Sequence, residues 1–226
     1  MRKRPHPPPR IPDIAAVVFD LDGVLVDSEP IHYRAANRVL GSYGAAINEV
    51  EYRAFIGLGE LATWRAWRQR YHIAVPVAQL LAAHTDARLR EVAAGVTTID
   101  AAVQLAHRLH AAGMPLAIAS SSTRVIIDAL LTAIGLAAVF RVRVSGEDPE
   151  VRHSKPAPDV YLAAAARLAT PPTACMAIED SAPGVAAAKG AGMFCIAIPN
   201  RWTADQDFSQ ADVVLESLRY FPLLLL

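Results

Sequence analysis

The chain has 226 residues, of which 53% are hydrophobic and 19% charged, enough for one larger domain or for a core domain with a smaller insertion. Lysine plus arginine and aspartate plus glutamate each total 22, so the formal net charge is zero, which argues against bulk electrostatic attraction to nucleic acid. No apolar run approaches the roughly 20 residues that span a bilayer, so we expect neither a nucleic acid nor a membrane as partner.

The N-terminal residues 1–13 are basic and rich in proline. This composition predicts a disordered lead-in, and the segment lacks the apolar centre of a secretory signal. Cys175 and Cys195 lie inside apolar runs without metal-ligand spacing. We therefore expect buried reduced thiols and a cytoplasmic protein, although the sequence leaves open a disulfide between neighbouring strands.

Short apolar runs alternate with alanine- and leucine-rich stretches along most of the chain. The runs are continuous, as in strands of a sheet that is covered on both faces, and a weaker one near the C-terminus indicates an edge strand. Gly113 and Gly135 are typical helix stops. The alternation predicts an α/β fold with a Rossmann-like, doubly wound parallel sheet. Strands are expected at 15–19, 115–119, 175–178, 194–198 and 212–215, and helices at 100–112, 123–134, 159–168 and 183–189.

Between the first strand and the first of these helices, the sequence shows only helical periodicity. Trp64, Trp67 and Tyr71 are spaced to share one helix face. A connection of this length without a strand is unusual for a single crossover. We therefore expect an all-helical cap over residues 29–96, inserted into a core made of residues 14–28 and 97–226.

Two aspartates separated by one residue follow the first predicted strand. Asp20 and Asp22 precede Gly23, whose backbone can turn sharply. In open α/β sheets, ligands bind beyond the carboxyl ends of the strands, so both carboxylates are placed to meet a substrate. A plain acidic turn or a calcium loop is the alternative for such a pattern alone, but the preceding buried strand argues against it.

Three further segments carry polar residues at or near strand ends. Ser120 and Ser121 directly follow the second predicted strand and can cradle a phosphoryl oxygen, or can simply cap the next helix. Lys155 lies in a Lys-Pro-Ala-Pro-Asp segment, in which Asp159 is a candidate N-cap. Glu179 and Asp180 follow another strand and offer oxygen ligands for a hard cation, while Asp180 is also a candidate helix cap.

Taken in this order, the four segments resemble the motifs of the haloacid dehalogenase superfamily, in its phosphatase and phosphomutase branch, over residues 14–200. The resemblance implies a nucleophilic Asp20 that becomes transiently phosphorylated. It also implies a Mg²⁺ ion held by the side chains of Asp20 and Asp180 and by the backbone carbonyl of Asp22. Glu179 would act on the ion through water. Phosphate binding would fall to Ser120, Ser121 and Lys155.

Asp22 decides the reaction class within this resemblance. It would protonate the leaving alkoxide and then activate water, whereas family members that cleave carbon–halogen bonds lack an aspartate at this position. A catalytically silent binding module on the same fold would be expected to have a damaged motif, and Asp20, Asp22, Ser120, Lys155 and Asp180 are all present. We therefore expect phosphoryl transfer.

The substrate is expected to be a small phosphorylated metabolite such as a sugar phosphate, and the protein a monomer. In the related β-phosphoglucomutases a cap loop carries an arginine that grips a second phosphate, and here residues 55–60 end in Glu60, which would repel it. This favours a phosphatase, with a phosphomutase as the alternative. His32, in the crossing to the cap, is a packing residue or a substrate contact, and Arg124 a distal-anion ligand or a surface residue.

Overall fold

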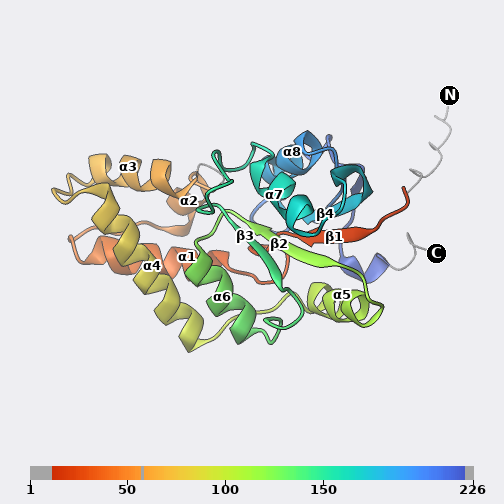
Figure 1. The fold of residues 1–226 in the computed structure, drawn as a ribbon. Helices are drawn as coiled ribbons and strands as arrows, with labels where there is room; N and C mark the ends of the chain where they lie inside the picture. Colours follow the sequence, from red (N-terminus) through yellow and green to blue (C-terminus); the bar gives the residue numbers. More distant parts are fainter. Residues whose placement is uncertain (1–11, 57–58, 222–226) are drawn as a thin grey trace, which may run out of the picture.

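The computed structural model describes residues 12–56 and 59–221. Most of the predicted lead-in and two residues of the predicted cap loop, Gly57 and Leu58, lie outside this range. Six strands form one parallel sheet in the order β3-β2-β1-β4-β5-β6, which confirms the predicted fold class (Figure 1). The strands are β1 (Ala16–Phe19), β2 (Leu116–Ser120), β3 (Val142–Ser145), β4 (Cys175–Glu179), β5 (Phe194–Ala197) and β6 (Val213–Val214).

The sequence did not predict β3, which lies at one edge of the sheet. Its two valines alternate with Arg143 and Ser145, so it lacks the continuous apolar run that marks the central strands. Arg143 instead uses its guanidinium to bind Asp128 at 2.5 Å and the Phe140 carbonyl at 2.8 Å. A charged residue is tolerated there because an edge strand is only partly covered.

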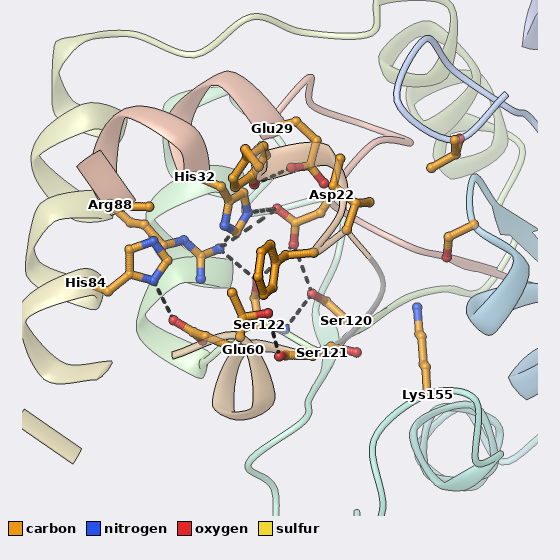
Figure 2. Close-up of a pocket in the computed structure, with 18 of the residues that line it drawn as sticks. Asp22, Glu29, His32, Glu60, His84, Arg88, Ser120, Ser121, Ser122 and Lys155 are labelled. Carbon is orange, nitrogen blue, oxygen red and sulfur yellow. Dashed lines mark hydrogen bonds and ion pairs between the residues drawn. The ribbon is translucent and has the colours of Figure 1, made fainter. Parts of the chain in front are cut away.

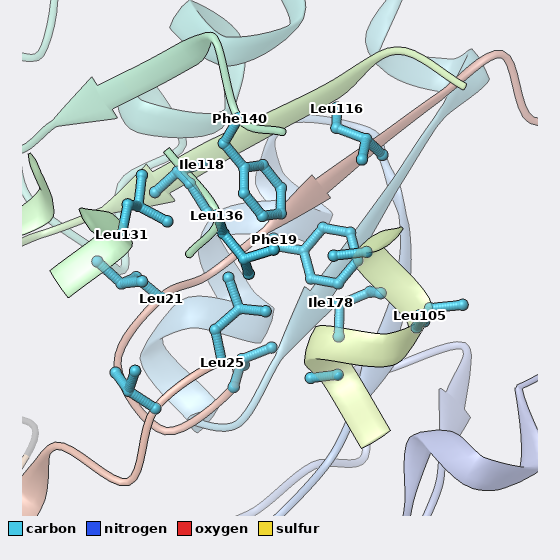
Figure 3. Packing of buried hydrophobic residues seen from close by; sticks show 14 of the residues in the cluster. Phe19, Leu21, Leu25, Leu105, Leu116, Ile118, Leu131, Leu136, Phe140 and Ile178 are labelled. Carbon is cyan, nitrogen blue, oxygen red and sulfur yellow. The ribbon is translucent and has the colours of Figure 1, made fainter. Parts of the chain in front are cut away.

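The two faces of the sheet are built from side chains of different size. Larger residues such as Phe19 and Ile178 pack against helices α5 (Asp100–Ala111) and α6 (Arg124–Ala133) (Figure 3). The opposite face carries mostly alanine and cysteine, with Val18 and Val144, and the alanine-rich helices α7 (Asp159–Arg167) and α8 (Ala182–Gly190) pack there. Strand side chains alternate between faces, and this alternation separates the two clusters. Both cysteines are buried free thiols, as predicted.

Between β1 and α5 the chain forms a separate helical layer, defined here as helices α1 to α4. These are α1 (Glu29–Gly41), α2 (Glu49–Arg53), α3 (Glu60–Arg70) and α4 (Val77–Ala94). They enclose a hydrophobic cluster of their own, in which Trp64 and Trp67 pack edge to face at 5.1 Å. Tyr71 lies just beyond the end of α3 and is partly buried against the same cluster.

Two adjacent chain crossings join this layer to the sheet. The backbone amide of Asp27 donates to the Thr97 carbonyl at 3.0 Å, and that of Ile99 donates to the Leu25 carbonyl at 2.9 Å. The helical layer therefore lies beyond the carboxyl end of β1, to the left of the sheet in Figure 1. Among the described helices, none is long and apolar enough to cross a membrane.

One predicted helix cap was wrong. Pro158, not Asp159, precedes the first turn of α7. The Asp159 carboxylate faces backward along the chain, where its Oδ2 accepts the backbone amides of Arg152 and His153 at 2.9 and 3.1 Å. It therefore braces the loop that carries Lys155 instead of capping the helix.

Candidate active site

The sheet order brings the acidic motifs together. Strand β1 pairs with β2 on one side and with β4 on the other. Asp20 follows β1, Ser120 ends β2, and Glu179 ends β4 with Asp180 directly after it. Because parallel strands end at the same edge, these side chains converge beyond one edge of the sheet, where α/β proteins bind ligands.

Lys155 is the cation at the centre of this group. Its Nζ donates to Asp20 Oδ1 at 2.6 Å, to Glu179 Oε1 at 2.5 Å and to the Ala119 carbonyl at 3.0 Å. Burial alone would lower the pKa of Lys155, but the charges of Asp20 and Glu179 outweigh burial and raise that pKa above its ordinary value. The lysine is therefore a fixed positive charge at the site.

The buried carboxylates outnumber this one cation. Burial, opposed by Lys155 and reinforced by Glu179, raises the pKa of Asp20 to about 8. Burial and the charge of Glu179 likewise raise the pKa of Asp180 above its ordinary value. Ionised carboxylates so close together need further positive charge.

The donor set suits a divalent cation. Carboxylate oxygens of Asp20, Glu179 and Asp180 lie within 4.8 Å of one another. Hard cations such as Mg²⁺ prefer oxygen ligands of this kind. In the described part of the chain, Asp20 Oδ2 and Asp180 Oδ1 accept no hydrogen bond, and both residues line the adjacent cavity. Asp20 and Asp180 are thus close enough to share an ion.

Glu179 is held differently. Its Oε1 accepts from Lys155 and from the Tyr161 hydroxyl at 2.7 Å, and its Oε2 accepts the backbone amides of Asp180 and Ser181 at 3.1 and 3.3 Å. The side chain is completely buried. These protein donors occupy both oxygens, so Glu179 directly orients Lys155 and the turn that carries Asp180.

Asp22 lies on the other side of the cavity, against the helical layer (Figure 2). Its Oδ2 accepts from Ser122 Oγ at 2.9 Å and from Ser120 Oγ at 3.3 Å, and its Oδ1 lies 3.3 Å from His32 Nε2. Burial would raise the pKa of Asp22, but the hydrogen bond and charge of His32 and the charge of Arg88 hold that pKa well below its usual value.

Arg88 links the helical layer to this carboxylate. It projects from α4, and its Nη2 donates to Ser122 Oγ at 2.9 Å and lies 3.2 Å from His32 Nε2 and 4.0 Å from Asp22 Oδ1 (Figure 2). Its side chain is 3% exposed, so the charge is almost completely desolvated. A buried cation from the helical layer therefore lies beside the second aspartate of the first motif.

A cavity of about 270 Å³ lies between the carboxylates of Asp20 and Asp180 and the helical layer. Its apolar wall comes from the helical layer and includes Trp64, Trp67 and Phe55. Polar groups interrupt that wall: Glu60 Oε1 lies 2.6 Å from His84 Nδ1, and the Tyr52 hydroxyl donates to Glu29 at 2.5 Å. The space suits a small polar molecule, with one end at Asp20 and the other beneath the helices.

Most of the residues singled out from the sequence meet at this cavity. Glu179 lies behind Lys155 and is not among the lining residues in the described chain. Arg124 is turned away: its Nη2 donates to both oxygens of Asp148, at 2.6 and 2.9 Å, which corrects the idea of a distal-anion ligand and leaves the surface alternative. The predicted residues that line the cavity are Asp20, Asp22, His32, Glu60, Ser120, Ser121, Lys155 and Asp180.

Sequence reasoning missed Arg88 and the contact of Ser122 with Asp22. Arg88 follows His84 by four residues on α4, and residues at this spacing share one helix face. Two basic side chains on one face of this helix, among the buried residues Leu80, Ala87 and Val92, were the available signal. Their target, however, is set by how α4 packs against α1 and α6, which the sequence does not specify.

Gly184 makes room for the Glu179 carboxylate in the first turn of α8. A Cβ atom at Gly184 would lie 1.9–2.1 Å from that carboxylate, so Gly184→Ala is expected to displace Glu179 and lower the free energy of unfolding by about 1–3 kcal/mol. Urea unfolding measures the change. Gly190→Ala, at the end of the same helix, is the matched control, because its Cβ would meet nothing closer than 3.5 Å. Equal stability of the two variants would contradict the steric argument.

Comparison with known proteins gives a consistent result. The sequence model of the family described as haloacid dehalogenase-like hydrolase matches residues 17–198. Protein CbbY of Rhodobacter capsulatus is 34% identical over 210 residues, which are 88% of this chain and 92% of CbbY. Fructose-1-phosphate phosphatase YqaB of Escherichia coli is 34% identical over 188 residues, 79% of this chain and 93% of YqaB.

The solved structures include CbbY from Rhodobacter sphaeroides in two complexes. The complex with phosphate superposes with a TM-score of 0.84 at 31% identity, over 91% of this chain and 95% of that one. A mutant of the same protein in complex with xylulose-(1,5)bisphosphate superposes with a TM-score of 0.83, over the same shares of both chains. The resemblance therefore extends over both the sheet and the helical layer.

Proposed function

Because the chain belongs to the haloacid dehalogenase-like hydrolase family, we propose that this hydrolase is a Mg²⁺-dependent phosphatase acting on a small sugar phosphate. The observation that carries the proposal is the pairing of two aspartates across one cavity. Asp20 lies beside Lys155 and Asp180, and Asp22 lies opposite them among hydroxyl and imidazole groups.

In the first half of the reaction, the Asp20 carboxylate attacks phosphorus and the bond from phosphorus to the ester oxygen breaks. A new bond joins Asp20 to the phosphoryl group. Because His32 and Arg88 keep Asp22 ionised in the free site, Asp22 takes up a proton when the substrate binds and gives that proton to the departing alkoxide. Lys155 neutralises charge on the phosphoryl oxygens, while Ser120 and Ser121 contribute hydroxyl and amide donors at the strand end. The products of this half are an alcohol and an aspartyl-phosphate.

The second half restores the enzyme. Asp22, now ionised, takes a proton from a water molecule that attacks the phosphorus, and the bond to Asp20 breaks. Inorganic phosphate leaves, and Asp22 is protonated again. The contacts of Asp22 with Ser122, His32 and Arg88 hold its carboxylate beside the cavity throughout.

Asp20 and Asp180 would hold the Mg²⁺ ion, with the Asp22 backbone carbonyl as a further ligand. A bound Mg²⁺ would offset the repulsion between the phosphate and the carboxylates and fix the orientation of the transferring group. The two carboxylate oxygens without protein partners in the described chain, Asp20 Oδ2 and Asp180 Oδ1, support this assignment. Glu179 would contribute by orienting Lys155.

We further propose that residues 29–96 act as a cap that chooses the substrate and excludes water. The helical layer supplies most of the apolar cavity wall and, through Arg88, contacts the acid-base residue directly. In this arrangement, Asp22 is fully positioned only when the layer is packed on the sheet. Closure of the helical layer on the sheet would thereby complete the site only when the phosphate ester is bound.

Ketose 1-phosphates head the candidate substrates. YqaB is named for fructose 1-phosphate, and the CbbY variant was crystallised with xylulose 1,5-bisphosphate; both compounds carry a phosphate on C1 of a ketose. The Glu29 and Glu60 carboxylates line the cavity and can accept hydrogen bonds from sugar hydroxyls. These features support a polyhydroxy leaving group.

A phosphomutase is the second candidate, and Arg88 is the observation in its favour. Glu60, in the loop at residues 55–60, is the residue that argues against a second phosphate. Glu60 lies against His84, whereas Arg88 brings a desolvated cation into the cavity from α4. Glu60 thus favours a phosphatase, while Arg88 is a cation that could bind the second phosphate of a bisphosphate.

Free-phosphate release tests the proposal. With Mg²⁺, the protein is expected to release inorganic phosphate from at least one of fructose 1-phosphate, xylulose 1,5-bisphosphate or phosphoglycolate. EDTA should abolish the release, and added Mg²⁺ should restore it, because Asp20 and Asp180 need the cation to bind phosphate. Conversion of β-glucose 1-phosphate to glucose 6-phosphate with little phosphate released would instead establish the mutase.

A further inference from the structure

Asn200 contacts the carboxylate of Asp180. It lies in the loop of residues 198–206 that follows β5, and its Nδ2 donates to Asp180 Oδ2 at 2.7 Å. Asp180 is buried, so this hydrogen bond to a charged acceptor is of the stronger kind. It occupies one carboxylate oxygen and leaves Oδ1 available toward the cavity.

The loop fixes which end of the Asn200 amide faces Asp180. Asn200 Oδ1 accepts the backbone amide of Trp202 at 2.8 Å, and a backbone N–H can only donate. The NH₂ group must therefore face the carboxylate. The Asn200 backbone amide donates to the buried Thr203 hydroxyl at 3.1 Å, so the position of the residue is also constrained.

The backbone of the first motif closes the other side of this pair. A Cβ atom at Gly23 would lie 2.1 Å from Asp180 Oδ2 and 2.9 Å from Asn200 Nδ2. Gly23 has a φ of +80°, a conformation that glycine adopts without strain. Asp180 is thus held between the turn after Asp20 and the amide of Asn200, with little freedom to rotate.

The same loop is anchored on the helical layer through Trp202. Two guanidinium groups lie over the indole ring, that of Arg53 on α2 at 4.6 Å and that of Arg201 at 4.7 Å from the ring centroid. Arg53 Nη1 also donates to the Arg201 carbonyl at 3.2 Å. Such stacking holds the loop in place, so the Asn200 amide is fixed from both the sheet and the helices.

We propose that Asn200 is a positioning residue, which holds Asp180 in the orientation that binds the divalent cation. This inference rests on the proposed function, because it takes Asp180 to be a metal ligand. Partners of ligating carboxylates set their orientation, and loss of such a partner typically reduces metal affinity about 10- to 100-fold. Asn200 would act on the cation through Asp180 alone.

Metal binding without substrate tests the role directly. Mn²⁺ is titrated into the protein and the free ion is followed by electron paramagnetic resonance, for the wild type, Asn200→Ala and Asn200→Leu. Leucine removes the donor while keeping the branched shape of the side chain, so it carries the test if alanine prevents folding. We expect a dissociation constant at least about tenfold higher in each folded variant. Asp205→Asn, at an exposed position of the same loop, should match the wild type.

A kinetic readout separates positioning from general damage. The Mg²⁺ concentration for half-maximal activity should rise in the Asn200 variants, while KM for the sugar phosphate at saturating Mg²⁺ should stay near the wild-type value. Folded variants with wild-type Mn²⁺ affinity would overturn the inference and leave the proposed function intact. A wild-type protein that binds no Mn²⁺ would overturn the proposed metal site itself.

Discussion

Asp20→Asn is expected to abolish turnover, with kcat lowered on the order of 10⁴-fold or more, as when a covalent nucleophile is removed. An amide cannot form the bond to phosphorus that the Asp20 carboxylate forms. The replacement has nearly the same shape, and its oxygen can still accept from Lys155 at the position of Oδ1. The fold should therefore be retained, and the loss should lie in the chemistry.

Two measurements separate loss of the nucleophile from a general disturbance of the site. In the first, the reaction is stopped with acid during turnover of a substrate labelled in its phosphoryl group. The wild-type protein should then carry the label, and Asp20→Asn should carry none. Asp27→Asn is the matched control, because Asp27 lies on the same segment but is not among the residues lining the active-site cavity in the described chain. Full phosphatase activity in Asp20→Asn would refute the covalent mechanism.

The fold was predictable where burial alone shaped the sequence. The central strands β1, β2, β4 and β5 are covered on both faces and therefore appear as continuous apolar runs. The edge strand β3 escaped because Arg143 interrupts its valines, and half-buried strands of four residues carry little periodic signal. The sequence signal is therefore strong for the buried central strands and weak for the two edge strands, of which β6 was predicted and β3 was not.

The site was predictable to the extent that it lies on the strands. Asp20, Ser120 and Asp180 are tied to strand ends, and parallel pairing alone brings strand ends together. Arg88 reaches the same cavity from α4, 34 residues before its partner Ser122. Its placement depends on how the helical layer packs on the sheet, for which a single sequence holds no marker.

Residues judged by charge alone were the least predictable. Burial would raise the pKa of Glu60, but the hydrogen bond and charge of His84 and the charge of Arg88 lower it, so Glu60 keeps its negative charge and its expected repulsion of a second phosphate stays a prediction. Arg124 was a candidate anion ligand, yet Asp148 accepts both of its hydrogen bonds. In each case a partner distant in the sequence decides what the charge can bind, and that partner is known only from the tertiary structure.

Asp22→Asn should separate the two proton transfers assigned to Asp22. For an alkyl phosphate, whose alkoxide is a poor leaving group, loss of the acid is expected to lower kcat about 10²- to 10⁴-fold. For p-nitrophenyl phosphate, the phenolate leaves without a proton, so the first half should remain fast. The amide oxygen of the replacement can still accept from Ser122 at the position of Oδ2, so the variant should keep the geometry of the site.

The second half of the reaction then becomes the diagnostic step, because asparagine cannot act as a base toward water. With p-nitrophenyl phosphate, Asp22→Asn should release one nitrophenolate per active site in a rapid burst and then turn over slowly, as the aspartyl-phosphate accumulates. Stopped-flow absorbance measures both phases. An equal loss with both substrates and no burst would mean that Asp22 only supports the structure. A burst of one nitrophenolate per active site would mean that Asp22 acts as both acid and base, and that Asp20 is phosphorylated between the two steps.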